Sequence, residues 1–286
     1  MPSFPIVDSH VHLYDIAHLS YPWLANVPKI NKSHGLAEFD AARGSVEVDG
    51  IVFAEVAVAP GQHLDEAAWA QGLADGDERI KGIVAHAPLE KGTAVEDDLI
   101  ALKRNASLRG IRRLIEVELD PRLCLEQDFL DALNLLPHHG LVFDICVKHW
   151  CLSFALELAH RCPDVSFVID HAGKPGIKHG MWEPWKEQMK ELARMPNVVC
   201  KLSGMITEAD HDKWTKDDVK PYVAHIIDCF GFGRLMYGSD WTVAELTHAY
   251  PDWVALIDEV IVGSSESEQR QLYRDTAIRT YHLQAI

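Results

Sequence analysis

The sequence predicts an α/β fold of the (β/α)8 type, in which eight parallel strands form a TIM-like barrel inside a ring of helices. Three observations predict it. Short apolar runs alternate with amphipathic helical patterns along the chain, there are eight such runs, and 286 residues is an ordinary length for one barrel. The runs are continuously apolar, which is typical of parallel strands buried on both faces. We therefore expect residues 1–286 to form one barrel domain, with an open, doubly wound sheet as the alternative.

Each predicted strand is a short apolar run, and the strands cover residues 6–8, 50–58, 80–85, 110–115, 141–147, 165–169, 198–202 and 235–237. Helical patterns lie between them at 65–75, 95–105, 129–136, 153–161, 182–194 and 216–230, and two more follow the last strand at 251–262 and 265–281. Pro137, Pro163 and Pro196 each end a helix shortly before a strand begins.

The composition is that of a globular enzyme, with 48% hydrophobic and 24% charged residues. The net charge of -16 disfavours nucleic acid and anionic membranes as partners. The expected partner is a small-molecule substrate, which the charge by itself does not identify. No apolar run is long enough for a membrane span, the first residues lack a signal-peptide pattern, and the six cysteines form no Cys-x-x-Cys pair. A cytoplasmic location is therefore expected, and the oligomeric state stays open.

Polar residues close every predicted strand, at the end where such barrels carry their active sites. His10 and His12 follow the first strand, and a spacing of two residues places their side chains on one face, about 6.6 Å apart. The later strand ends contribute Glu55, His86, the Arg112–Arg113 pair, Asp144 with Lys148, Asp170 with His171, Lys201 with Ser203, and Asp240. Surface charges would fall mostly in helices and loops, so this pattern predicts a catalytic site.

These motifs resemble the amidohydrolase superfamily in three places: His10-x-His12, His171 in Asp-His-Ala-Gly-Lys-Pro, and Asp240 in Tyr-Gly-Ser-Asp-Trp. The loop with Trp23 and the strand with Arg112 look like its lactonase branch. The resemblance covers essentially the whole chain. It implies a hydrolase that opens a sugar-derived lactone, such as L-fuconolactone or L-rhamnonolactone, to the aldonic acid. A pyrone dicarboxylate lactonase and a zinc-dependent decarboxylase of the same superfamily are the alternatives.

His10, His12 and Asp240 are the candidate metal ligands, and zinc accepts such nitrogen and oxygen donors. Typical metal-dependent members carry a lysine or histidine ligand on strand five, where this chain has Asp144 and Lys148. We therefore expect at most one zinc ion. The branch that the chain resembles also includes members that work without a metal, so a weak zinc site and a metal-free site both stay open.

Asp240 is the candidate general base, and His171 is the second candidate catalytic residue, as a donor to the developing oxyanion. The expected substrate-binding residues are Trp23, Arg112, Asp144, Lys148, Lys174 and Trp241. Adjacent arginines face opposite ways, and the resemblance favours Arg112 as the inward one. Each of these residues also has a purely structural alternative. Asp240 could cap a helix, His171 could cap a turn, and His10 and His12 could be ordinary hydrogen-bonded histidines. Lys148 and Lys174 could be solvated loop charges, and the tryptophans could be packing residues.

Overall fold

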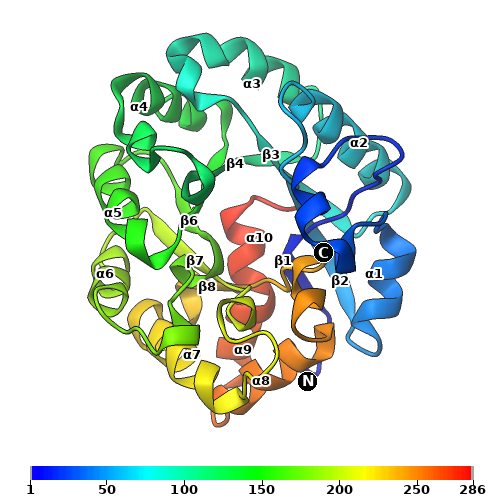
Figure 1. The fold of residues 1–286 in the computed structure, drawn as a ribbon, viewed down its shortest axis with the longest axis vertical. Helices are drawn as coiled ribbons and strands as arrows, with labels where there is room; N and C mark the ends of the chain where they lie inside the picture. The colour runs from blue at the N-terminus through cyan, green and yellow to red at the C-terminus, as the bar shows by residue number, and fades with distance from the viewer. Residues whose placement is uncertain (1, 285–286) are drawn as a thin grey trace.

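The computed structural model describes residues 2–284, and eight parallel strands form its centre (Figure 1). They pair in the order of the sequence: β1 Ile6–Val11, β2 Val48–Ala54, β3 Ile80–His86, β4 Leu108–Leu114, β5 Val142–Cys146, β6 Phe167–Ile169, β7 Val198–Leu202 and β8 Leu235–Tyr237. A parallel bridge between Val11 and Trp241 links the first strand to the segment after the last one, so the barrel is nearly closed. The predicted fold class is confirmed.

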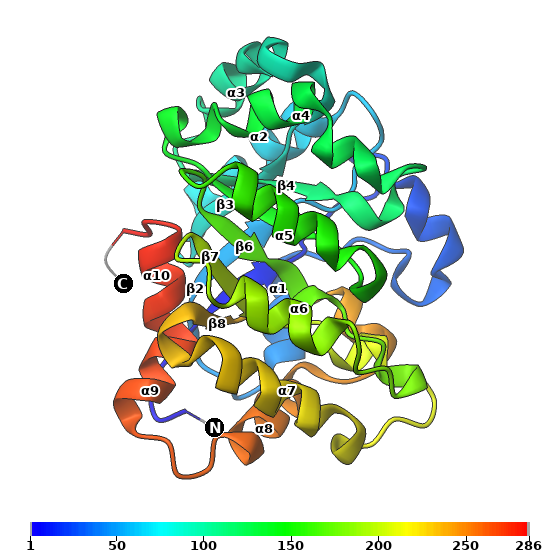
Figure 2. The same cartoon turned by 90° about the vertical axis from the view of Figure 1, so that its left-hand side faces the viewer.

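Helices surround the strands in the views of Figures 1 and 2. They are α1 Leu36–Arg43, α2 His63–Gly76, α3 Glu96–Leu102, α4 Gln127–Leu133, α5 Leu152–Arg161, α6 Trp185–Leu192, α7 Lys216–Phe230, α8 Tyr250–Val260, α9 Glu266–Arg270 and α10 Thr276–Thr280. The pattern at 265–281 predicts one helix, but a π-helical segment, Gln271–Asp275, lies between α9 and α10. Among residues 2–284, no helix combines the length and the apolar character that a membrane crossing requires.

The sequence pattern did not predict α1. Phe39 is the one residue of this helix that is buried, so its apolar stripe is too narrow to give a helical periodicity. The first strand was predicted too short. It continues to Val11, which brings His10 into the strand itself.

An apolar layer and the C-terminal segment close one end of the barrel. The strands contribute Val7, Val52, Val84, Val142, Val168 and Met236, and the end of the chain adds Tyr281 and Leu283. In Figure 1, α10 accordingly lies in the middle of the ring, and Figure 2 shows it at one end of the barrel. The carboxyl ends of the strands are at the opposite end, where the polar residues gather.

Candidate active site

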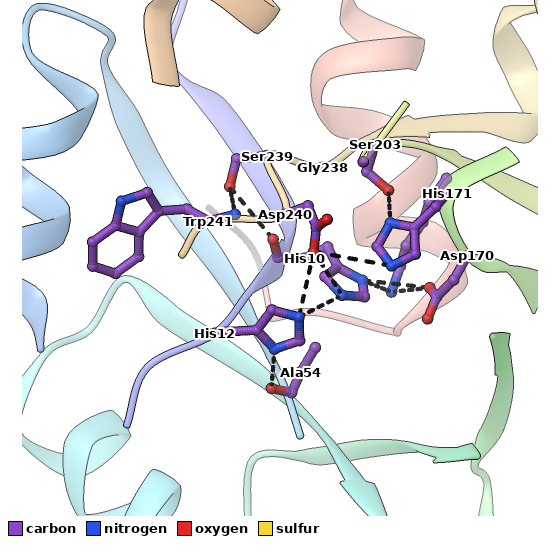
Figure 3. Close-up of polar contacts among 12 residues, drawn as sticks. His10, His12, Ala54, Asp170, His171, Ser203, Gly238, Ser239, Asp240 and Trp241 are labelled. Atoms are coloured by element: carbon purple, nitrogen blue, oxygen red, sulfur yellow. Dashed lines mark hydrogen bonds and ion pairs between the residues drawn. The ribbon is translucent and has the colours of Figure 1, made fainter. Parts of the chain in front are cut away.

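Three histidines and one aspartate meet at the carboxyl end of the barrel (Figure 3). His10 and His12 come from β1, His171 follows β6, and Asp240 follows β8. The Nε2 atoms of His10 and His12 lie 3.1 Å apart. From Asp240 Oδ1, the Nε2 atoms of His12, His10 and His171 lie at 3.4, 3.8 and 4.0 Å. All four side chains are buried, so we define them as the His–Asp cluster.

The backbone holds Asp240 and His171 in an unusual conformation, because both residues are left-handed, with φ values of 58° and 53°. Such a conformation costs about 1–2 kcal/mol for a residue other than glycine. It also argues against the capping alternatives. The short helix after Asp240 receives no side-chain cap from it, and the ring of His171 instead contacts Ser203 Oγ through Nδ1 at 2.9 Å. Residues held under strain are typical of functional sites.

Two glycines make room for this arrangement. A Cβ atom on Gly204 would lie 2.6 Å from His171 Nδ1 and 2.8 Å from Asp240 Oδ2. A Cβ atom on Gly238 would lie 2.9 Å from the Cβ of His10. The backbone therefore approaches the cluster more closely than any other residue type allows.

The cluster has a suitable geometry for one divalent ion. A tetrahedral zinc ion with bonds of about 2.1 Å separates its ligand atoms by about 3.4 Å. The pairwise distances among His10 Nε2, His12 Nε2 and Asp240 Oδ1 are 3.1, 3.4 and 3.8 Å. A second group, made of His10, Asp170 and His171, shares His10 with the first. By distance and donor type, the predicted trio could hold a metal.

A layer of buried charges lies directly against the cluster. Lys201 Nζ donates to Asp144 Oδ2 at 2.5 Å and contacts His10 Nδ1 at 3.1 Å. It also lies 3.1 Å from Asp170 Oδ1, while Arg112 Nε lies 3.0 Å from Asp170 Oδ2. Burial opposes ionisation of Asp170, but Lys201, His10 and Arg112 hold the pKa of this carboxyl well below its usual value. The two cations and two carboxylates thus compensate one another inside the barrel.

The imidazoles of His171 and His10 are neutral near pH 7. Burial lowers the pKa of His171 to about 4, and burial together with Lys201 lowers the pKa of His10 well below its ordinary value. Burial opposes ionisation of Asp240, but His171, followed by the other two histidines, holds the pKa of Asp240 below its usual range. On acidification the imidazole of His171 therefore takes up a proton before the Asp240 carboxyl does. At neutral pH Asp240 is therefore a carboxylate that faces three imidazole rings.

A polar cavity of about 520 Å³ is lined by residues of the segments that follow β5, β6 and β7. Lys148, Trp150 and Glu208 are among its lining residues, and the substrate-binding role of Lys148 remains a prediction. Burial raises the pKa of Glu208, and the charge of Asp240 also acts on this carboxyl. The charge of Asp240 is thus felt at the cavity wall, at the same end of the barrel as the cluster.

Arg112 points into the barrel, as the resemblance implied. Its Nη1 donates to the Glu55 carbonyl at 3.0 Å, and its Nε faces Asp170. Arg113 points the other way and pairs with Glu90 and Glu118. The guanidinium of Arg112 is thus already engaged on both sides.

Two placements expected from the sequence are wrong. Asp144 does not face a substrate: it is fully buried beneath the cluster and receives hydrogen bonds from Lys201 and from the Tyr281 hydroxyl at 2.7 Å. Trp241 does not lie on the rim. Its side chain points away from the cluster (Figure 3), is fully buried against Phe39, and donates to Glu245.

Trp23 and Lys174 lie near the carboxyl end of the barrel, but both are already engaged. The indole nitrogen of Trp23 donates to the Val56 carbonyl at 2.7 Å. Lys174 Nζ donates to Glu116 Oε1 at 2.5 Å. Their substrate-binding roles remain predictions, and any such role for Lys174 would act together with Glu116.

A family comparison identifies the chain. The model of the amidohydrolase family matches residues 7–283. The chain belongs to this family. The sequence-based expectation of a hydrolase is thus confirmed, and the His–Asp cluster lies within the matched region.

Two curated relatives and one solved structure show how similar this amidohydrolase is to known proteins. It is 30% identical to an L-fucono-1,5-lactonase of Burkholderia multivorans, covering 97% of this chain and 96% of that protein. It is 24% identical to an L-rhamnono-gamma-lactonase of Scheffersomyces stipitis, and the match covers 99% of this chain and 100% of that protein. A crystal structure of a B. multivorans amidohydrolase with bound zinc superposes with a TM-score of 0.88 at 28% identity. The superposition covers 98% of this chain and 100% of that one.

Sequence reasoning missed Glu116 and Glu208 and assigned no role to Lys201. Lys201 could have been found, because Val199, Lys201 and Ser203 alternate along β7 and so share one face with the other inward residues. Glu116 and Glu208 lie in short 3-10 segments after β4 and β7, where no periodicity signals orientation.

Proposed function

We propose that this amidohydrolase opens a polyhydroxylated aldonolactone by attack of water, giving the open-chain aldonic acid. The observation that carries the proposal is the buried Asp240 carboxylate, which three imidazoles face at the carboxyl end of the barrel, where a polar cavity also lies. The relatives named for L-fuconolactone and L-rhamnonolactone support the same substrate class.

Asp240 acts as the general base. One of its oxygens accepts a proton from water as the water oxygen bonds to the lactone carbonyl carbon. When the carbon–oxygen bond of the ring breaks, Asp240 returns this proton to the departing ring oxygen, which becomes a hydroxyl group. The new carboxylic acid then ionises and releases one proton to solvent.

His171 and His10 stabilise the negative charge that develops on the carbonyl oxygen. Both imidazoles are neutral and fixed by contacts at Nδ1, to Ser203 and Lys201 respectively, so their Nε2 atoms are held toward the reacting groups. Donors that are oriented before the reaction usually contribute the largest part of the catalytic effect. A zinc ion held by His10, His12 and Asp240 would, when bound, polarise the carbonyl and acidify the water.

The cavity wall suits hydroxyl groups better than a second carboxylate. Its lining includes a donor, Lys148, and an acceptor, Glu208. A pyrone dicarboxylate would instead require free inward arginines. Arg112 is already paired with Asp170, and Arg113 points away from the site. This arrangement favours a sugar lactone over the dicarboxylate alternative.

A pH-indicator assay against a panel of aldonolactones tests the proposal. Ring opening releases one proton per turnover, whereas a decarboxylation consumes one, so the sign of the change separates the two reactions. We expect Asp240→Asn to lower the rate by at least about two orders of magnitude while the fold is kept. Asp97→Asn, on the exposed face of α3, is the matched control and should retain full activity. Proton uptake, or an Asp240→Asn enzyme with more than about a tenth of the activity, would contradict the mechanism.

A further inference from the structure

We propose that Lys201 fixes the tautomer of His10 and thereby keeps the zinc affinity of the His10–His12–Asp240 trio low. The hydrogen bonds around His10 determine where its ring proton lies. Lys201 Nζ is a donor only, and it lies 3.1 Å from His10 Nδ1. His10 Nδ1 must therefore accept this hydrogen bond, which leaves the single proton of the neutral ring on Nε2.

The neighbouring histidine has the opposite tautomer. His12 Nδ1 lies 3.0 Å from the Ala54 carbonyl, which is an acceptor only, so Nδ1 of His12 carries the proton. His12 Nε2 is then free to accept, and it lies 3.1 Å from His10 Nε2. One continuous chain of donors results, from Lys201 through His10 and His12 to Ala54, and each bond in it has one donor and one acceptor.

This chain is compatible with the distances of a metal site but not with its proton requirements. Each histidine must offer a lone pair on Nε2 to bind one shared ion. His12 meets this requirement as it stands, whereas His10 carries a hydrogen on that atom. His10 could bind the ion only after its proton moved to Nδ1, where the ammonium of Lys201 already points.

Asp170 could accept a hydrogen bond from the alternative tautomer, since its Oδ1 lies 3.4 Å from His10 Nδ1. Lys201 occupies the nearer position, however, and it is held there by Asp144 at 2.5 Å and by Asp170 at 3.1 Å. The contacts of Lys201 with His10, Asp144 and Asp170 therefore hold the lysine in place and oppose the change of tautomer in His10. Within the lactone hydrolysis proposed above, on which this role rests, the His10 Nε2–H that donates to His12 Nε2 in the free enzyme would be shared with the carbonyl oxygen of a bound lactone.

Nitrogen NMR of the metal-free wild-type protein tests the tautomer directly. In protein labelled with 15N-histidine, long-range proton–nitrogen spectra distinguish the protonated ring nitrogen from the other, and a His10→Gln variant assigns the signals of His10. We expect a protonated Nε2 and an unprotonated Nδ1 for His10. A proton on Nδ1 would overturn the proposal, whatever the enzyme hydrolyses.

Zinc titration against a chromophoric chelator tests the consequence. Outer contacts of a metal ligand typically change affinity by about 10- to 100-fold, so Lys201→Met should bind zinc at least about tenfold more tightly than wild type. Lys174→Met is the control, because it also removes a positive charge, partly buried, that acts on His171 of the cluster but does not contact His10. It should change zinc affinity by less than about threefold.

Lys201→Met leaves Asp144 and Asp170 without their shared cation, which can prevent folding. The double variant Lys201→Met/Asp144→Asn removes one charge of each sign, and the same gain in zinc affinity is expected from it. Unchanged zinc affinity in the folded Lys201 variant, or an equal gain in Lys174→Met, would refute the role of Lys201. Lactonase activity is not used as a readout, so failure of this proposal and failure of the proposed function can be distinguished.

Discussion

Replacement of Gly204 by alanine should damage the active site more than the fold. Gly204 has a φ of 56°, and an added Cβ would lie 2.6 Å from His171 Nδ1 and 2.8 Å from Asp240 Oδ2. Both atoms belong to the proposed catalytic groups. The backbones of both residues are already in the left-handed region, which restricts how far their side chains can move away. The methyl group must therefore push the imidazole and the carboxylate apart.

The magnitude follows from two separate contributions. Placing alanine in the left-handed region costs about 1–2 kcal/mol. Forcing a methyl group into a filled space costs about a further 1–3 kcal/mol. The free energy of unfolding should thus fall by about 2–5 kcal/mol. For catalysis, a displacement of about 1 Å in a reacting group lowers the rate by about 100-fold.

Gly140→Ala is the matched control for this experiment. Gly140 has a φ of 65°, but nothing lies within 4 Å of the position that an added methyl group would take, so the variant carries the backbone cost alone. Urea denaturation should show a smaller loss for Gly140→Ala, and its kcat/KM on the best aldonolactone should stay at the wild-type level. If Gly204→Ala kept more than about a third of wild-type kcat/KM, the contact between His171 and Asp240 would not be catalytically important.

Three further predictions concern substrate, metal and pH. A polyhydroxylated aldonolactone should exceed an unsubstituted valerolactone by at least about tenfold in kcat/KM, and equal values would contradict recognition of hydroxyl groups. Zinc-saturated, desalted protein should contain at most one equivalent by elemental analysis, because both possible ligand groups share His10, and two equivalents would contradict this limit. Burial, and then the nearby Glu55 carboxylate, raise the pKa of Glu66 above its ordinary value of 4.5, so the folded protein retains a proton that the unfolded chain loses. The stability that Glu66 contributes is therefore present below pH 4.5 and lost as pH rises, and Glu66→Gln should gain stability relative to wild type in urea denaturation as the pH rises above 4.5. Parallel stability profiles for the two proteins would refute this sign.

The order of strands could be predicted because parallel strands buried on both faces leave an unambiguous apolar pattern. The ends of the elements could not. The strand predicted at 50–58 ends at Ala54, because Glu55 and Ala57 hydrogen-bond to each other locally and Ala57 has a φ of 51°. Such turns depend on side-chain contacts and on backbone angles that residue types alone do not specify.

Much of the site could also be predicted, because barrel closure brings all carboxyl ends of the strands to one mouth. His10, His12, His171 and Asp240 therefore meet although 230 positions separate the first from the last. Depth within the barrel was not predictable. Asp144 has the same polar character as Asp240, but its partners include Tyr281 from the end of the chain, and no pattern in β5 indicates that contact.

The charged layer beneath the cluster is best explained by what it does to the residues above it. Buried ion pairs seldom stabilise a fold more than apolar side chains of the same size, and valines fill the layer below without any charge. Lys201 and Asp170, in contrast, both lie within 3.4 Å of His10 Nδ1, so they decide which nitrogen of that ring carries the proton. Apolar replacements would pack the barrel but leave the His10 ring free to change tautomer. The polar residues at the strand ends therefore have two roles. Asp240 and His171 at the mouth contact the reacting groups, and Lys201 and Asp170 beneath them fix the proton positions on which that chemistry depends.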